Sequence, residues 1–301
     1  MTQGKTLIWG FYDQGNIGDD LMAAMVCELA EQAGGRPVIL TRNPRFADMG
    51  YATTDSLQGL EVDRILLGGG AFFKTGGPAA SAIERAIADL ARFMTENGIP
   101  AFGVSIGSDG VDTLRDLSPA RKSVVESPCF RGACVRLKAD LALGLPNLAY
   151  LPDIVLCTKE ATGQFARLRV IDPGPDAPET LINLSRRSAL QIPRALWLAR
   201  GQRAAFFRAH TGPSPTGGEL VLPFFRDVNE NSINKALGYL QRAPIICSSK
   251  LHPGVIAMSF GNRFVSISPR PKTLAFLRQN EGTGVSLAPY LAAISGFLNG
   301  G

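Results

Sequence analysis

Few side chains in this 301-residue chain are suited to binding a transition metal. There are two histidines and five cysteines, and Cys129 and Cys134 form the only close cysteine pair. A structural zinc site needs four such ligands at short, regular spacings, so we expect no metal site. The cysteines stand mostly inside apolar runs, which predicts buried, reduced thiols without disulfide bonds.

Long apolar runs are also missing from the sequence. No run approaches the roughly 18 residues of a membrane-spanning helix. The apolar stretch at residues 6–12 ends at Asp13 and is too short for a signal peptide. We therefore expect a soluble, cytoplasmic protein.

The excess of charge of one sign is small. Lys and Arg number 31 and Asp and Glu 26, which gives a formal net charge of +5. The basic residues are scattered and do not alternate with aromatic residues, so nucleic acid is not an expected partner. With 45% hydrophobic and 19% charged residues, the composition is that of a globular protein with a large core.

The sequence does contain an alternation of short apolar runs and amphipathic segments. Residues 6–10, 37–40, 64–67 and 101–107 are apolar runs of strand length. Residues 20–29 carry their apolar side chains on one helical face, and residues 79–96 have a longer helical pattern. Alternating strands and helices predict a parallel β-sheet covered by helices on both faces.

Three prolines in a short span predict a linker between two domains at residues 159–179. The alternation then restarts, with strands expected at residues 180–185, 203–208, 245–247 and 263–267, and helices at 227–240 and 251–260. We predict an α/β fold of two Rossmann-like domains, residues 1–160 and 178–288, facing a central cleft. A final helix, residues 289–301, is expected to pack back on the N-terminal domain.

Two glycine-rich turns follow predicted strands. The first is Gly15-Asn-Ile-Gly-Asp-Asp20 and the second is Gly68-Gly-Gly70. Glycines let the backbone approach a ligand closely, and free N–H groups at a helix start attract anions. The structural alternatives are that Asp19 and Asp20 favour the helix start and that the three glycines form a tight turn. The G-x-G-x-x-G spacing is absent, which disfavours a nicotinamide-dependent oxidoreductase.

Three cationic side chains follow predicted strands in different parts of the chain. His252 opens a helix directly after a strand, while Lys272 and Arg136 each follow another strand. The carboxyl ends of parallel strands are where α/β sheets bind ligands, so we expect these groups to converge in the cleft. Together they suit a small, highly charged anion such as a phosphorylated carboxylate. His210 stands in a loop rich in glycine and proline and receives no role.

Taken in order, these motifs resemble those of the polysaccharide pyruvyl transferase family. The matching segments span most of the chain: Gly15-Asn-Ile-Gly-Asp-Asp-Leu21, Gly68-Gly-Gly70, Gly103-Val-Ser-Ile-Gly107, Val135-Arg136, Pro152-Asp153, Ser249-Lys-Leu-His252 and Lys272. The resemblance implies a GT-B enzyme with two Rossmann-like domains. It also implies transfer of pyruvate from phosphoenolpyruvate to two hydroxyls of a sugar in a cell-surface polysaccharide or its lipid-linked repeat unit, forming a ketal and releasing phosphate.

The resemblance assigns roles to individual residues. His252 matches the family's catalytic histidine, and Arg136 and Lys272 match basic residues that bind the donor's carboxylate and phosphate. The other expected substrate-binding residues lie in the same motifs: Gly15, Asn16, Gly18, Asp19, Gly69, Gly70, Ser249 and Lys250. Lys250 and Pro253 depart from the family pattern, which has Arg and Gly there. Lys250 keeps the charge but loses the bidentate fork of a guanidinium.

We expect His252 to be the general acid that protonates the methylene carbon of phosphoenolpyruvate. Asp13, Asp19 and Asp153 are candidate bases for the sugar hydroxyl. No cofactor is expected beyond the donor substrate. The expected acceptor is a glycan or a lipid-linked oligosaccharide, and the net charge is compatible with peripheral contact at the inner face of the cell membrane. The sequence predicts no oligomeric state.

Two alternatives remain open at the level of sequence. The first is a GT-B glycosyltransferase whose sugar-nucleotide donor binds at the same helix N-termini through its pyrophosphate. The second is a non-catalytic module that binds an anionic glycan or metabolite. Stabilisation by phosphoenolpyruvate or by nucleotide sugars separates the first alternative from pyruvyl transfer.

Overall fold

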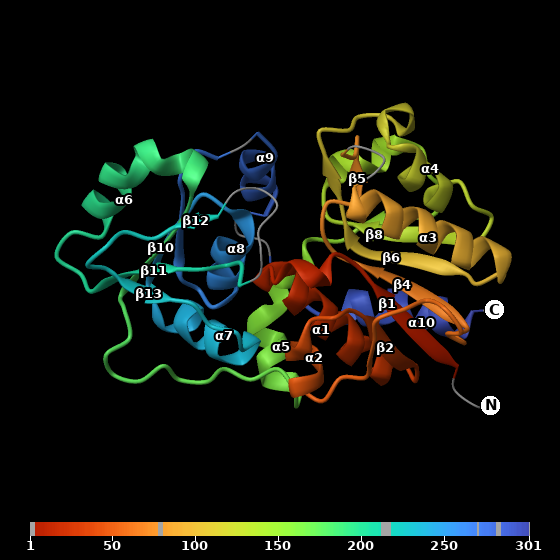
Figure 1. Ribbon diagram of the computed structural model, residues 1–301, viewed down its shortest axis with the longest axis horizontal. Helices are drawn as coiled ribbons and strands as arrows, with labels where there is room; N and C mark the ends of the chain where they lie inside the picture. Colours follow the sequence, from red (N-terminus) through yellow and green to blue (C-terminus); the bar gives the residue numbers. More distant parts are fainter. Residues whose placement is uncertain (1–3, 78–80, 212–217, 270, 281–283, 301) are drawn as a thin grey trace. The chain divides into compact units, whose positions relative to one another are not determined.

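The computed structural model describes residues 4–77, 81–211, 218–269, 271–280 and 284–300 (Figure 1). The contacts divide the chain into two compact units. Unit 1 takes the described residues of Met1–Tyr12, Met22–Ile154 and Ser286–Gly301. Unit 2 takes those of Asp13–Leu21 and Val155–Val285.

Unit 1 is built on a seven-stranded parallel sheet in the order β3-β2-β1-β4-β6-β8-β9. Its strands are β1 (Lys5–Trp9), β2 (Arg36–Leu40), β3 (Thr53–Thr54), β4 (Arg64–Gly68), β6 (Ala101–Ile106), β8 (Phe130–Val135) and β9 (Leu148–Tyr150). A separate parallel pair joins β5 (Phe73–Lys74) to β7 (Ser108–Asp109). The central strands are buried, as their apolar sequences predict.

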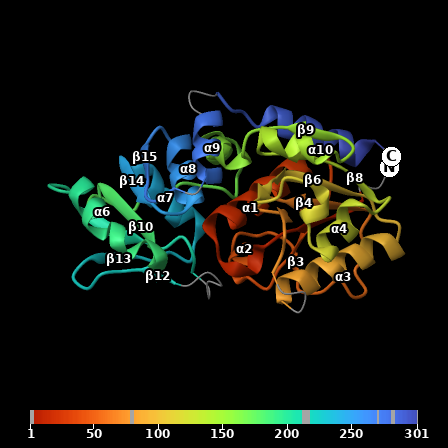
Figure 2. The same ribbon diagram turned by 90° about the horizontal axis from the view of Figure 1, so that it is seen from above.

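The helices of unit 1 cover both faces of this sheet. They are α1 (Ile17–Gln32, whose first residues belong to unit 2), α2 (Pro44–Asp48), α3 (Ala82–Glu96), α4 (Pro119–Val125) and α10 (Ala288–Asn299), with 3₁₀ turns η2 (Leu114–Asp116) and η3 (Lys138–Leu143). Two more 3₁₀ turns, η1 (Tyr12–Gln14) and η4 (Ile154–Cys157), begin in unit 1 and end in unit 2. Figures 1 and 2 show α3 and α4 on one face and α10 on the other. Phe297 of α10 stacks on Phe102 of β6, which confirms that the C-terminal helix packs on the N-terminal domain.

Unit 2 has a second sheet with parallel strands in the order β13-β11-β10-β14-β15, and β12 pairs antiparallel with β10. Its strands are β10 (Thr180–Ser185), β11 (Ala204–Phe207), β12 (Glu219–Leu220), β13 (Arg226–Val228), β14 (Ile245–Ser248) and β15 (Arg263–Ser266). Its helices are α5 (Thr158–Gln164), α6 (Ile192–Leu198), α7 (Ile233–Arg242), α8 (Leu251–Ser259) and α9 (Pro271–Asn280), with the 3₁₀ helix η5 (Arg186–Gln191).

One predicted helix of unit 2 is wrong over its first residues. The helix expected at residues 227–240 begins at Ile233, because Ser232 caps it by accepting a hydrogen bond from Lys235 N. The preceding segment is the edge strand β13, in which Val228 pairs with Phe207 of β11. The linker expected at residues 159–179 also begins as helix, since α5 runs to Gln164.

The two sheets share one strand order. In each, the first strand along the chain (β1 or β10) lies beside the fourth parallel strand to be added (β4 or β14), and the order reverses between them. Such a topological switch point is where open α/β sheets bind ligands, outside the carboxyl ends of the strands. The fold therefore offers one candidate position in each unit.

The glycine-rich loop at residues 15–19 belongs to unit 2, although it was expected in the N-terminal domain. The reason is hydrogen bonding to the segment after β11. Ile17 N donates to Ala209 O at 2.9 Å, and Thr211 N donates to Gly15 O at 3.1 Å. These bonds bring two segments together that are far apart in sequence.

All five cysteines are buried and free of disulfide bonds, as predicted. None of the helices in the described ranges has the length and apolar composition that crossing a membrane requires.

Candidate functional site

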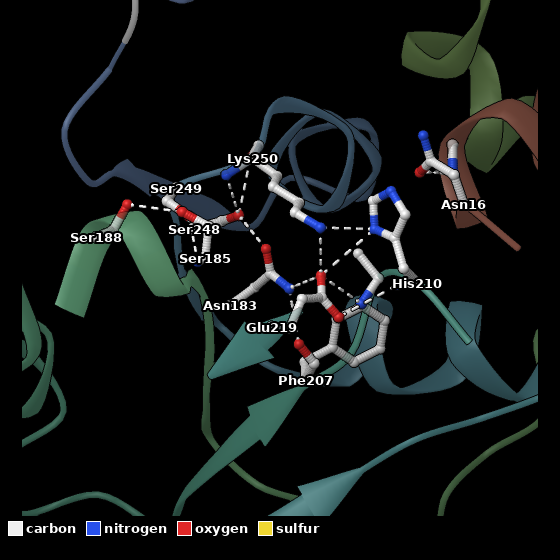
Figure 3. A network of polar contacts seen from close by, with 12 residues as sticks. Asn16, Asn183, Ser185, Ser188, Phe207, His210, Glu219, Ser248, Ser249 and Lys250 are labelled. Carbon is white, nitrogen blue, oxygen red and sulfur yellow. Dashed lines mark hydrogen bonds and ion pairs between the residues drawn. The ribbon is translucent and has the colours of Figure 1, made fainter. Parts of the chain in front are cut away.

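The switch point of unit 2 is lined by polar side chains (Figure 3). Asn183 of β10 and Ser248 of β14 are buried, and Ser248 Oγ lies 3.0 Å from Asn183 Oδ1. Ser185 N, at the end of β10, donates to Ser249 Oγ at 2.9 Å. Ser249, predicted to bind substrate, therefore lies at the switch point with its oxygen fixed by the neighbouring strand.

A buried carboxylate holds Lys250 beside this switch point. Lys250 Nζ lies 2.9 Å from Glu219 Oε1, and Asn183 Nδ2 donates to the same oxygen at 2.7 Å. The backbone N–H groups of Ala209 and His210 donate to the Glu219 carboxylate at 3.2 Å each. The Glu219 side chain is only 3% exposed, so its charge depends on these partners.

These contacts control the ionisation of Glu219. Burial acts to raise its pKa, but the hydrogen bonds and charges of His210, Lys250 and Asn183 outweigh burial and lower the pKa to about 2. The carboxylate is therefore charged at neutral pH. Lys250, predicted to contact substrate, is thus also an internal partner of a buried acid.

The same lysine contacts His210. Lys250 Nζ lies 2.7 Å from His210 Nδ1, whereas Glu219 Oε1 is 3.5 Å from that nitrogen. His210, which sequence reasoning left without a role, therefore lies beside both charged groups of this pair.

The loop at residues 15–19 contacts His210 through its backbone. Asn16 forms an antiparallel bridge with His210. Asn16 also caps α1, because its Oδ1 accepts from Gly18 N at 3.2 Å. Its Nδ2 donates to Asp19 Oδ2 at 2.6 Å. The predicted binding residues Gly15, Asn16, Gly18 and Asp19 thus form one ordered helix entry.

His252 lies against the same loop. A Cβ atom added at Gly18 would stand 2.0 Å from His252 Nδ1, so only glycine allows this approach. His252 is half-buried in the first turn of α8, where helical N–H groups point out of the helix. Pro253 follows in that first turn and is buried, so the departure from the family pattern fits the helix. The chain's two histidines therefore both contact one loop.

The switch point of unit 1 is filled by a side chain. Tyr12 is 1% exposed, and its hydroxyl donates to Gly68 O at 2.9 Å. A Cβ at Gly68 would lie 2.2 Å from that hydroxyl, and one at Gly69 would lie 2.4 Å from the sulfur of Met22. Gly69 and Gly70 both have positive φ, and Gly70 O accepts from Gly107 N. Packing and turn geometry thus explain the three glycines.

Arg136 and Asp153 form an internal ion pair in unit 1. Arg136 NH1 lies 2.9 Å from Asp153 Oδ2, and their side chains are 9% and 0% exposed. Ser105, a buried residue with a φ of 55°, has its Oγ 3.5 Å from Asp153 Oδ1 and accepts from Ile154 N. These contacts explain the positions of Arg136 and Asp153 without a substrate. Whether either residue meets a donor or acts as a base stays a prediction.

Two further predicted residues, Asp13 and Lys272, are placed by the elements that contain them. Asp13 is exposed in η1, and Lys272 is in the first turn of α9 with its side chain outside the described part of the structure. The convergence of Arg136 and Lys272 on His252 therefore stays a prediction. Among the residues that the structure describes, no three His, Cys, Asp or Glu side chains group as metal ligands would.

Sequence reasoning missed Asn183, His210 and Glu219. Asn183 left a signal, because it interrupts the apolar strand sequence Thr180-Leu-Ile-Asn-Leu-Ser185. A polar residue inside a buried strand needs an internal partner. Nothing local marks Glu219 or His210, since their contact with Lys250 forms only when β12 pairs with β10.

No protein-family model and no curated protein sequence matches the chain. Solved structures do. A Listeria monocytogenes protein described as a UDP-N-acetylglucosamine 2-epimerase matches with a TM-score of 0.52 and 11% identity over 88% of this chain and 79% of that one. S. aureus MnaA, solved with UDP, matches with a TM-score of 0.51 and 12% identity over 98% and 91%. The calicheamicin glycosyltransferase CalG4 gives a TM-score of 0.43 and 12% identity over 99% and 93%.

The first two of these likenesses establish the fold class. The chain is an α/β protein of the GT-B type with parallel sheets in two domains, which confirms the class predicted from the sequence. That the two sheets face one another across a cleft stays a prediction.

Proposed function

We propose that this protein is a transferase that takes its transferred group from phosphoenolpyruvate and places it on two hydroxyls of a glycan as a pyruvate ketal. One observation carries the proposal: His252 lies against Gly18. These residues belong to two of the motifs that carry the family resemblance, and the two motifs lie far apart in the sequence. Their contact is what a shared binding site requires.

The residues of unit 2 supply the features that such a donor needs. The first turn of α8 offers N–H groups and a partial positive charge to a phosphate. Lys250 carries a positive charge at the cap of that helix, and Ser249 precedes it. His252 in the same turn has an imidazole that can hold and release a proton near neutral pH.

The reaction assigned to this site balances in protons and bonds. A proton from His252 adds to the methylene carbon of phosphoenolpyruvate, and one sugar hydroxyl forms a C–O bond at the neighbouring carbon. The C–O bond to phosphate breaks, and the second hydroxyl closes the ketal. One hydroxyl proton leaves with the phosphate, and the other passes through the base and restores the proton that His252 gave to the methylene carbon. By resemblance, Arg136 and Lys272 would contact the donor and Asp13, Asp19 or Asp153 would serve as the base.

Product analysis tests this assignment. Wild-type protein is incubated with phosphoenolpyruvate and a panel of glycans and lipid-linked oligosaccharides, and phosphate release and product mass are followed. We expect a ketal product, and we expect His252→Gln to lower turnover by about 10²–10⁴-fold, the usual contribution of a positioned acid. Unchanged turnover in the variant would remove His252 from this role.

A sugar nucleotide is the second candidate donor, favoured by the fold likeness to proteins described as acting on or solved with UDP compounds. Thermal unfolding separates the two donors. At a ligand concentration of 100 times Kd, binding stabilises the folded state by about 2.7 kcal/mol. Stabilisation by phosphoenolpyruvate supports pyruvyl transfer, whereas stabilisation by UDP-N-acetylglucosamine or UDP alone supports the sugar-nucleotide reading.

A further inference from the structure

The positive net charge of this protein is concentrated in one segment. Residues 180–218 contain six arginines and no Asp or Glu. The whole chain has 31 basic and 26 acidic residues, so without this segment it would carry one more acidic than basic residue. Strands β10 and β11 of this segment are buried, and its exposed arginines lie in the stretch between them without any acidic residue beside them in sequence.

The segment includes η5 and α6, which Figures 1 and 2 show as an outer helical stretch of unit 2. On its inner side Ala195 and Ala199 pack with Ile182 and Phe206 of the sheet. Two large apolar side chains of this stretch are exposed. Leu190 of η5 is 92% exposed and Trp197 of α6 is 68% exposed. Arg194 stands between them in sequence.

Four arginines stand near these two apolar side chains in sequence. Arg186, Arg187, Arg194 and Arg200 are exposed, and among the described residues no ion pair or side-chain hydrogen bond holds their guanidinium groups. The other two, Arg203 and Arg208, are paired with Glu179 and Asp227. We define the outer face as Arg186, Arg187, Leu190, Arg194, Trp197 and Arg200.

We propose that this outer face docks on the surface of an anionic lipid bilayer. The exposed leucine and tryptophan of this stretch enter the boundary between headgroups and acyl chains, and the exposed arginines near them in sequence bind phosphate groups of anionic lipids. Tryptophan suits this position because its ring is apolar and its N–H remains near water. The contact is peripheral and reversible, because the helix is short and carries two apolar anchors.

A second copy of the chain and a nucleic acid both fit the side chains of the outer face less well. A symmetric contact between two copies would place the same four arginines opposite one another with no acidic residue to separate them. A nucleic acid would satisfy the arginines but would leave Leu190 without an apolar partner. A bilayer interface satisfies both kinds of side chain.

Vesicle sedimentation tests the proposal. We expect wild-type protein to sediment with phosphatidylcholine vesicles that contain phosphatidylglycerol, to remain in solution with phosphatidylcholine alone, and to lose binding as salt is raised. Arg187→Gln with Arg194→Gln should lower the vesicle partition coefficient about 30-fold, since each cation contributes about fivefold. The matched control is Arg92→Gln with Arg278→Gln, which removes the same charge from exposed sites on α3 and α9 and should leave binding intact.

Tryptophan fluorescence gives a second readout. The chain has two tryptophans, and Trp9 is buried at 4% exposure, so a change on vesicle addition reports Trp197. We expect a blue shift with anionic vesicles and none in Trp197→Phe. Trp197 and the two substituted arginines are all exposed, and circular dichroism verifies the fold of each variant.

Three results would overturn the proposal. They are equal binding of the paired arginine variant and wild type, equal binding to neutral and anionic vesicles, and a dimer in sedimentation that Trp197→Ser abolishes. The last would assign the outer face to a second copy of the chain. None of these outcomes depends on which donor the switch point binds.

Discussion

The two switch points differ although their sheets share one strand order. In unit 1 the position between β1 and β4 is closed by Tyr12, whose hydroxyl binds Gly68 O. In unit 2 the position between β10 and β14 holds Ser249, a charged lysine and the helix start that carries His252. Strand order therefore specifies where a ligand could bind, and the side chains at that position decide whether it does.

Two buried ion pairs, one from each unit, also differ in what else they contact. Arg136 and Asp153 pair with each other inside unit 1. Lys250 and Glu219 pair in unit 2, but Lys250 also binds an imidazole that contacts the loop at residues 15–19. The first pair lies within unit 1, whereas the second also contacts a side chain beside the glycine-rich loop.

The largest expected effect comes from breaking the ion pair between Arg136 and Asp153 in unit 1. Asp153→Ala leaves the Arg136 guanidinium buried without its carboxylate, which should cost about 3–5 kcal/mol of unfolding free energy. Denaturant unfolding measures the loss. The control is Asp89→Ala, which removes an exposed pair with Arg92 and should cost less than about 1 kcal/mol. Equal small losses would mean that the pair in unit 1 is not structural.

The pH dependence of stability tests the pair in unit 2. The pKa of Glu219 is lowered to about 2 in the folded protein, against about 4.3 in an unfolded chain. A lowered pKa contributes stability that is complete above pH 4.3 and is lost as pH falls toward 2. The contribution is about 3 kcal/mol at neutral pH.

Glu219→Gln should therefore be less stable than wild type at pH 7, and the two unfolding free energies should converge below pH 4. Asp176→Asn, at a side chain that is 97% exposed, is the control and should show no such convergence. A difference between wild type and Glu219→Gln that is the same at every pH would contradict the assigned ionisation.

A third prediction concerns the loop that meets both histidines. Gly18→Ala places a Cβ within the His252 ring position and should lower turnover by at least about 10²-fold, or about 2.7 kcal/mol, because the ring must move. Gly163→Ala is the matched control, since no atom lies within 4 Å of a Cβ there. Full activity in Gly18→Ala would show that the close approach of this loop to His252 is not needed for turnover.

The smallest expected effects come from one substitution at each switch point. Tyr12→Phe removes one buried hydrogen bond and should cost about 1 kcal/mol of stability without changing donor affinity. Ser249→Ala should weaken donor binding several-fold while the fold persists. Calorimetric titration with phosphoenolpyruvate compares the two variants. If phosphoenolpyruvate binding were weaker in Tyr12→Phe alone, the donor site would lie in unit 1.

Much of the fold follows from local sequence. The apolar run at residues 180–185 is the strand β10 in the structure, and the helical pattern ending at residue 96 ends there in α3. The edge strand β13 was missed because its three residues, Arg226–Val228, have no apolar pattern and pair only after β11 is in place. Local pattern fails where tertiary pairing decides the conformation.

The candidate site was predictable in part. Glycine spacing and a histidine after a strand indicated residues 15–18 and His252, because such turns serve backbone approach and helix starts. The partnership of His210, Lys250 and Glu219 was not predictable, since a buried ion pair leaves no local pattern. The assignment of residues 13–21 to unit 2 likewise depends on hydrogen bonds with residues 209–211.

The two imidazoles report directly on whether phosphoenolpyruvate binds beside His210 and His252. Because the chain has two histidines, an imidazole ¹H–¹⁵N NMR spectrum resolves both rings, and His252→Gln assigns them. We predict that phosphoenolpyruvate shifts the signals of both rings saturably, with His252 moving toward the protonated pattern. Rings that stay unchanged with phosphoenolpyruvate, or that respond only to UDP-N-acetylglucosamine, would contradict the account.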